Sequence, residues 1–138
     1  MRVVGCFLEH DNTFALLKRH AYKPDGSTWG LPAGKVEPKE SDESAIIREL
    51  YEETGYRSDA SELDFLGVYT FVMPSGITND FVTYRVRLRE PHELILENAA
   101  HSEYIWISAE EAYQMSDLIF GLHELLTMVG LVTIDNQQ

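Results

Sequence analysis

Three glutamates lie close together in a segment that has the pattern of a helix: Glu49, Glu52 and Glu53. At about 100° per residue they share an arc of about 100° on the helix surface. Carboxylate oxygens are the ligands that Mg²⁺ or Mn²⁺ prefers, and a bound cation would remove the repulsion between like charges at (i, i+3) and (i, i+4) spacing. The helix alone leaves two interpretations open, a divalent-metal site and a solvated acidic face.

The rest of this helix predicts how the glutamates are presented. Ser41 is a suitable N-cap and Gly55 a suitable C-terminal stop, so we expect a helix over residues 42–54. Four apolar residues form one arc nearly opposite the carboxylates, and we expect them to pack on a sheet: Ile46, Ile47, Leu50 and Tyr51.

Acidic residues are concentrated around this helix. The chain of 138 residues carries a formal net charge of −12, from 23 acidic and 11 basic residues. The 28 residues from Glu37 to Asp64 hold ten acidic and three basic residues, a net charge of −7. This balance disfavours binding to long nucleic acids or to anionic membranes, and it is compatible with carboxylates that hold cations.

The spacing around the helix favours the metal site. Gly34 is followed by five residues and then Glu40, and seven further residues lead to the sequence Arg48-Glu49-Leu50-Tyr51-Glu52-Glu53-Thr54-Gly55-Tyr56. This resembles the signature of the Nudix hydrolases, with all seven fixed residues in place. With each fixed residue used at roughly 6%, a chance match is on the order of one in 10⁸ per starting position. Two positions depart from the pattern: Tyr56 stands at the final aliphatic position, and Ala33 stands where many members have a second glycine.

The resemblance implies a fold and an activity. The fold would be of the α/β class, a small α/β/α sandwich with a mixed β-sheet, formed by residues 1–138 as a single domain whose polar end at 135–138 is expected to fray. The activity would be Mg²⁺- or Mn²⁺-dependent hydrolysis of the pyrophosphate linkage in a nucleoside diphosphate derivative. We expect a nucleoside triphosphate, including a damaged (d)NTP. ADP-ribose or another nucleotide sugar is the alternative substrate, and a non-catalytic nucleotide-sensing domain is the alternative function.

The resemblance also implies which residues bind the metal. Glu49, Glu52 and Glu53 would be ligands together with the backbone carbonyl of Ala33, and one of the glutamates would serve as the general base. Arg48 would hold the glutamate cluster by ion pairing rather than take part in catalysis.

Other residues of the motif have supporting roles in the family. Glu40 would be structural or lie outside the metal ligands, Gly34 would let the chain turn sharply into the site, and Gly55 would end the helix. The family also often takes a further catalytic carboxylate from the loop before the last strand. Here Glu97 and Glu103 are candidates, and Glu103, three residues before Trp106, is favoured; a carboxylate at the rim without a catalytic role is the alternative.

Candidates for substrate contacts lie outside the motif. Trp29 could line a nucleotide pocket, Phe71 could stack on a base, and Arg19 ends a strand where the family often contacts phosphate. For the two aromatic residues, core packing is the alternative role, and for Arg19 the alternative is a solvated strand end. The five histidines show no ligand spacing, and His101 is the strongest candidate among them.

The remaining pattern predicts a mixed sheet with helices packed on it. Two short apolar runs flank Asp11 and Asn12 as a hairpin, and Ser108 with Glu111 matches a capping box. The expected strands are residues 3–8, 13–18, 63–73, 81–88 and 104–107, with an extended piece at 29–34, a loop at 20–28 and helical spacing over 118–129.

Composition also limits the compartment and the partners. No apolar run approaches the ~18 residues of a membrane span. The single cysteine, Cys6, excludes an internal disulfide and favours a reducing compartment, so we expect a cytoplasmic protein with a small nucleotide as its partner. A homodimer is left open.

Overall fold

The computed structural model describes residues 1–134, so the polar end at 135–138 lies outside the described residues. The strands, in chain order, are β1 (Arg2–His10), β2 (Thr13–Arg19), β3 (Trp29–Gly30), β4 (Ala33–Lys35), β5 (Asp64–Val72), β6 (Thr78–Arg87) and β7 (His101–Ile107). The helices are α1 (Asp42–Thr54), α2 (Ala109–Tyr113) and α3 (Leu122–Met128), and a 3-10 turn spans Ala60–Glu62.

The strands form one mixed sheet. Along its main path the order is β3-β2-β1-β6-β5, with β4 also paired to β1 and β7 to β2. β1 and β6 run parallel, and the other pairs are antiparallel. The predicted hairpin joins β1 to β2, and Asp11 and Asn12 both adopt left-handed conformations at its tip, with φ of 49° and 63°. This is the backbone that a tight two-residue hairpin turn requires.

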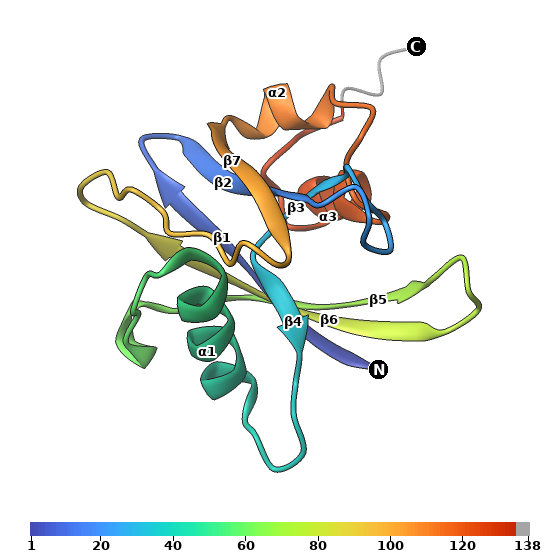
Figure 1. Ribbon diagram of the computed structural model, residues 1–138, viewed down its shortest axis with the longest axis horizontal. Coiled ribbons are helices and arrows are strands. Elements are labelled where there is room, and N and C mark those ends of the chain that lie inside the picture. Colours follow the sequence, from blue (N-terminus) through green and yellow to red (C-terminus); the bar gives the residue numbers. More distant parts are fainter. Residues whose placement is uncertain (135–138) are drawn as a thin grey trace.

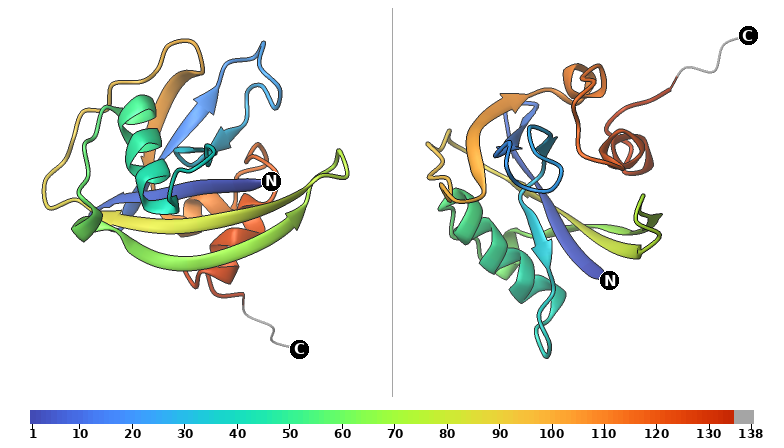
Figure 2. Two further views of the ribbon diagram at one scale, coloured as in Figure 1. Left: turned by 90° about the horizontal axis from the view of Figure 1, so that it is seen from below. Right: turned by 45° about the vertical axis from the view of Figure 1, so that its right-hand side comes forward.

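Side chains alternate between two cores because successive residues of a strand point to opposite faces. On β1, Val4, Cys6 and Leu8 pack against α1, whereas Phe7 packs on the other face with α2 and α3. Figure 1 shows α1 on one side of the sheet and α2 with α3 on the other, and Figure 2 shows the same layers from two further directions. The predicted α/β/α arrangement with a mixed sheet is therefore confirmed.

The helix that carries the glutamates has the predicted bounds. Ser41 accepts a hydrogen bond from the backbone N–H of Ser44 at the N-cap, and Gly55 takes a left-handed conformation with φ of 79° at the other end. Asp42 and Glu43 lie in the first turn, where negative charge is favourable to the helix dipole.

The last helix is shorter than the sequence predicts. We expected helical spacing over residues 118–129, but α3 begins at Leu122, after Gly121 with φ of 89°. Leu118 instead forms a bridge to Trp29, whose backbone N–H bonds to the carbonyl of Asp117 and whose carbonyl accepts the N–H of Ile119. Among residues 1–134, none of the helices has the length and hydropathy that a membrane crossing requires.

Candidate metal and nucleotide site

Helix α1 turns two of the three glutamates toward the sheet. Glu49 and Glu53 are buried, each 9% exposed, whereas the side chain of Glu52 is 48% exposed. The prediction that Tyr51 packs on the sheet is wrong: it is 46% exposed and lies 4.0 Å beneath the guanidinium of Arg57. The buried side of α1 is thus rotated from the apolar arc toward the carboxylates.

Gly34 makes room for this rotation. A Cβ placed on Gly34 would overlap the Glu49 carboxylate, with Oε2 at 2.6 Å and Oε1 closer still. Gly34 lies within β4, paired with Val4 of β1, and its φ is not positive. The expectation that Gly34 provides a sharp turn is therefore wrong. The missing side chain matters because the strand and the carboxylate approach so closely.

Glu53 is fixed to the same strand. Its Oε1 accepts a hydrogen bond from the backbone N–H of Ala33 at 2.8 Å. Ala33 does not have a positive φ, so alanine replaces the family's glycine here without backbone strain. The bond places the Glu53 carboxylate beside the backbone of Ala33. The family resemblance implies that the carbonyl of Ala33 is a metal ligand.

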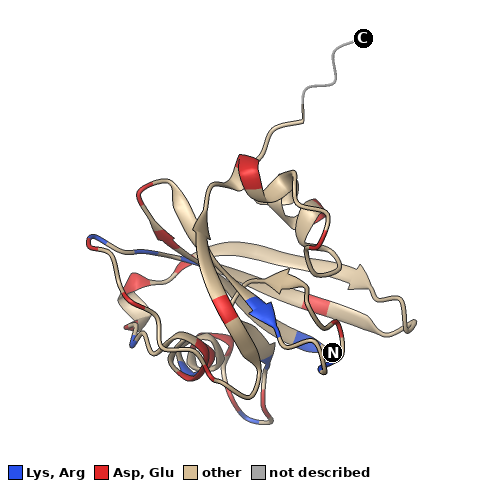
Figure 3. Cartoon of the chain, turned by 45° about the horizontal axis from the view of Figure 1, so that its top comes forward, with Lys and Arg blue, Asp and Glu red and all other residues tan. Residues whose placement is uncertain are grey.

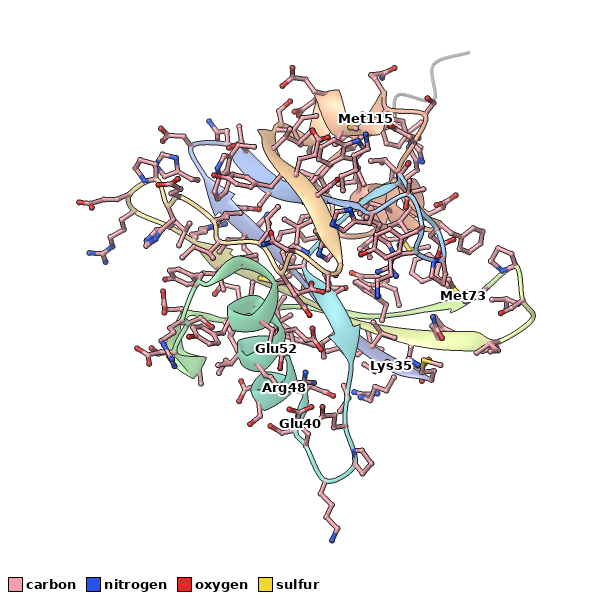
Figure 4. All side chains as sticks on the ribbon, viewed as in Figure 1. Lys35, Glu40, Arg48, Glu52, Met73 and Met115 are labelled. Atoms are coloured by element: carbon pink, nitrogen blue, oxygen red, sulfur yellow. The ribbon has the colours of Figure 1, made fainter. Side chains whose placement is uncertain are left out.

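Arg48 is surrounded by oxygen acceptors. Its Nε and Nη2 donate to both oxygens of Glu40 at 2.8 and 3.0 Å, and Nη2 also donates to the Lys35 carbonyl at 3.0 Å. Its Nη1 donates to Glu49 at 2.7 Å and to Glu52 at 3.3 Å. Figure 4 shows Glu52 and Arg48 one after the other along α1, with Glu40 beyond them on the segment that leads into the helix. The guanidinium lowers the pKa of Glu40 to about 2.

The buried carboxylates resist ionisation. Burial raises the pKa of Glu53 to about 8, and the charges of Glu49 and Glu97 add to the rise. Burial also raises the pKa of Glu49, although Arg48 opposes the effect. A cation bound between these groups would add compensating charge to the part that Arg48 and Arg19 supply.

This electrostatic strain predicts a pH-dependent stability. The metal-free native protein keeps a proton on Glu53 up to about pH 8, whereas the unfolded chain loses that proton near pH 4.5. The native state therefore binds more protons between these values, and the free energy of unfolding should fall as pH rises, by up to about 1.4 kcal/mol per pH unit. Glu53→Gln should remove this component.

Urea unfolding with EDTA at pH 6.5 to 8 measures the difference between the wild type and Glu53→Gln. The window avoids His101, whose pKa is lowered to about 4 by burial and whose titration acts in the opposite direction below pH 6.5. Glu52→Gln is the matched control because its side chain is half exposed. Equal slopes in the wild type and Glu53→Gln would contradict the prediction.

The residues present fit a divalent cation in charge and chemistry. Glu49 and Glu53 supply buried oxygen donors from adjacent turns of α1, and Glu52 supplies an exposed one. Among residues 1–134, no three His, Cys, Asp or Glu side chains already converge as a ligand set. In this arrangement Arg48 donates to oxygens of Glu49 and Glu52, and the backbone N–H of Ala33 donates to an oxygen of Glu53.

A cavity of about 250 Å³ lies next to Glu53. Its lining includes Glu53, Gly34, Arg19 and His101. Arg19, proposed from sequence as a phosphate contact, therefore lies in the same cavity as Glu53, and its Nε donates to the Pro24 carbonyl at 2.8 Å. His101 is 6% exposed and its Nδ1 has no hydrogen-bond partner among residues 1–134.

The structure does not bring Glu103 to this cavity. Glu103 lies 3.8 Å from Lys18 and shares a strand face with Ile105, on the side of α2 and α3. The strand irregularity between Lys18 and Arg19 turns His101 to the opposite face, and no sequence pattern predicts this irregularity. Of the two candidate carboxylates, Glu97 is the one whose charge acts on Glu53.

A second, apolar cavity of about 170 Å³ adjoins the first. Phe71 lines it, as the sequence proposed for a base-stacking residue. Trp29 lines neither cavity. It is 7% exposed in the core beside α3, and the ammonium of Lys18 lies 5.7 Å from its ring. Asn79, which lines both cavities, was missed from the sequence because no motif marks it.

Figure 3 shows acidic segments on α1 and on the loops beside it.

The NUDIX domain family model matches residues 1–126. The CTP pyrophosphohydrolase of Escherichia coli (strain K12) is 28% identical over 114 residues, which cover 83% of this chain and 80% of that protein. A putative 8-oxo-dGTP diphosphatase of Bacillus subtilis (strain 168) is 42% identical over 62 residues, only 45% of this chain and 38% of that protein. The crystal structure of the MutT protein from Methanosarcina mazei Go1 superposes with a TM-score of 0.82 at 24% identity, covering 94% of this chain and 91% of that one. The chain belongs to the Nudix hydrolase family.

Proposed function

We propose that this protein hydrolyses a nucleoside triphosphate, including damaged forms, within its pyrophosphate linkage, as a single domain in the cytoplasm and with Mg²⁺ or Mn²⁺ as cofactor. The observation that carries the proposal is the buried carboxylate of Glu53, which lines the same cavity as Arg19 and lies one turn of α1 from the buried Glu49. The relatives named as a CTP pyrophosphohydrolase and a putative 8-oxo-dGTP diphosphatase support a triphosphate substrate.

We assign a separate role in the reaction to each residue of the site. Glu49 and Glu53 would hold the metal with the Ala33 carbonyl, and Arg19 would meet the phosphate oxygens in the shared cavity. A metal bound there would neutralise phosphate charge and lower the pKa of an attacking water. We assign Glu52 to accept the proton of that water because it is the glutamate with the greatest access to solvent. The water oxygen forms a bond to one phosphorus of the anhydride between the α- and β-phosphates, the bond from that phosphorus to the bridging oxygen breaks, and a nucleoside monophosphate and pyrophosphate are released.

A substrate panel tests the proposal. The purified protein, with Mg²⁺ or Mn²⁺, should convert at least one nucleoside triphosphate into a monophosphate and pyrophosphate, identified by chromatography of the products. The panel includes canonical and oxidised triphosphates, ADP-ribose, dinucleoside polyphosphates and nucleotide sugars. Turnover of ADP-ribose alone would replace the proposed substrate, and binding without turnover across the panel would favour a sensing domain.

A further inference from the structure

The apolar cavity is shaped for one ring system. Its volume of about 170 Å³ is below the ~300–1,000 Å³ of pockets that enclose whole drug-sized ligands. Aromatic and aliphatic side chains from distant segments form its walls, among them Leu31, Phe71, Phe81 and Ile119. No Lys, Arg, Asp or Glu lines it within the described chain, so a neutral, flat group suits it better than a phosphate.

The cavity continues into the one that contains Glu53. Both are lined by Val3, Gly30, Leu31, Ala33, Asn79 and Ile119. A nucleotide whose phosphates lie near Glu53 can therefore place its base among the aromatic residues without leaving this continuous space. This continuity is what identifies the occupant of the apolar cavity as a nucleobase, and the identification rests on the proposed function.

Asn79 is the polar side chain of the apolar cavity, and no other polar side chain lines it among residues 1–134. It lies near the start of β6, opposite Phe71 of β5. Its Oδ1 is shut off from solvent and has no hydrogen-bond partner within the same residues. Buried amide oxygens normally have a partner, so an unpaired one beside an apolar ligand cavity needs an explanation.

We propose that Asn79 is the specificity-determining residue of the site and hydrogen-bonds the polar edge of the nucleobase. A base that enters an apolar pocket loses water from its polar edge and needs replacement partners. A carboxamide offers two N–H donors and an acceptor, so it pairs with a base edge that presents a donor next to an acceptor. When the carboxamide rotates so that Oδ1 faces the cavity, Asn79 gains the partner that it lacks, and the base recovers the hydrogen bonds that it loses.

Two substitutions at this position test the inference. Asn79→Leu keeps the approximate size but removes both hydrogen-bonding groups. It should reduce the ratio of kcat/KM between the best and the worst nucleoside triphosphate by about five- to 150-fold. Asn79→Asp has only acceptors, so it should shift preference toward guanine nucleotides, whose edge presents two neighbouring donors. Thr78→Leu, on the adjacent exposed position of β6, is the matched control and should keep the wild-type ranking.

Affinities of non-hydrolysable triphosphate analogues are measured in parallel by calorimetry, which separates the two proposals. If the wild type binds nucleotides without turning them over, the proposed hydrolysis fails while the ranking of affinities still tests Asn79. A ranking in Asn79→Leu within twofold of the wild type, together with no shift in Asn79→Asp, would overturn the inference. If the wild type binds no nucleotide, both proposals fall.

Discussion

Glu53→Gln is expected to lower metal-dependent hydrolysis by about two to four orders of magnitude while the protein stays folded. Glutamine keeps an oxygen that can accept the Ala33 N–H, so the link between α1 and β4 survives. What disappears is the negative charge that a cation needs in a buried position. The measurement is kcat/KM on the best substrate of the panel, with circular dichroism and Mg²⁺ titration of the same samples.

Two further variants of the same helix sharpen this result. Glu52→Gln should also lose orders of magnitude in activity, because Glu52 is assigned to the proton of the attacking water. Glu43→Gln lies in the first turn of α1, outside the site, and should keep wild-type activity. Wild-type turnover in both Glu52→Gln and Glu53→Gln would refute the proposal that the glutamates of α1 bind the metal and activate the water. A loss in Glu43→Gln would point to helix stability instead.

Gly34→Ala is expected to reduce activity about a hundredfold through a single added methyl group. The new Cβ would overlap the Glu49 carboxylate, and pairing of β4 with β1 prevents the backbone from moving away. Glu49 must therefore leave its position. Overpacking of this kind also costs about 1–3 kcal/mol of stability, which urea unfolding measures.

A double-mutant cycle isolates the cause. If overlap with Glu49 accounts for all of the stability that Gly34→Ala loses, the same substitution should cost little stability in a chain that already carries Glu49→Ala. The activity of that double variant should remain low because a metal ligand is missing. An equal stability loss in both backgrounds would show that the methyl group clashes with something other than Glu49.

Local sequence patterns predicted much of the fold. Ser41 and Gly55 bound α1 as expected, and the alternation on β1 separates Val4, Cys6 and Leu8 from Phe7. These features depend on neighbouring residues or on a period of two or of 3.6, which the sequence shows directly. The start of α3 was harder to predict because Gly121, in a left-handed conformation, interrupts the favourable apolar spacing just before Leu122.

The orientation of α1 depended on a partner that lies elsewhere in the chain. Hydrophobicity alone places the buried arc over Ile46, Leu50 and Tyr51. The helix instead buries Glu49 because Gly34, on a different element, has no side chain. A carboxylate in the interface contradicts the pattern on which the prediction rests, and such local violations are expected at functional sites.

The remaining residues of the site come from segments whose proximity exists only in the folded chain. Phe71, Asn79 and Ile119 line one cavity from β5, β6 and the segment before α3. Glu103 was favoured because it precedes Trp106, but strand alternation turns it to the far face. Neither outcome follows from spacing along the sequence, since each is set by how strands pair and where a strand is irregular.

The contacts of Arg48 have a consequence for the order of events after synthesis. One guanidinium pairs with Glu40, Glu49 and Glu52, so it offsets part of the repulsion between these carboxylates. We therefore expect the newly made chain to reach its native structure before any divalent ion is bound.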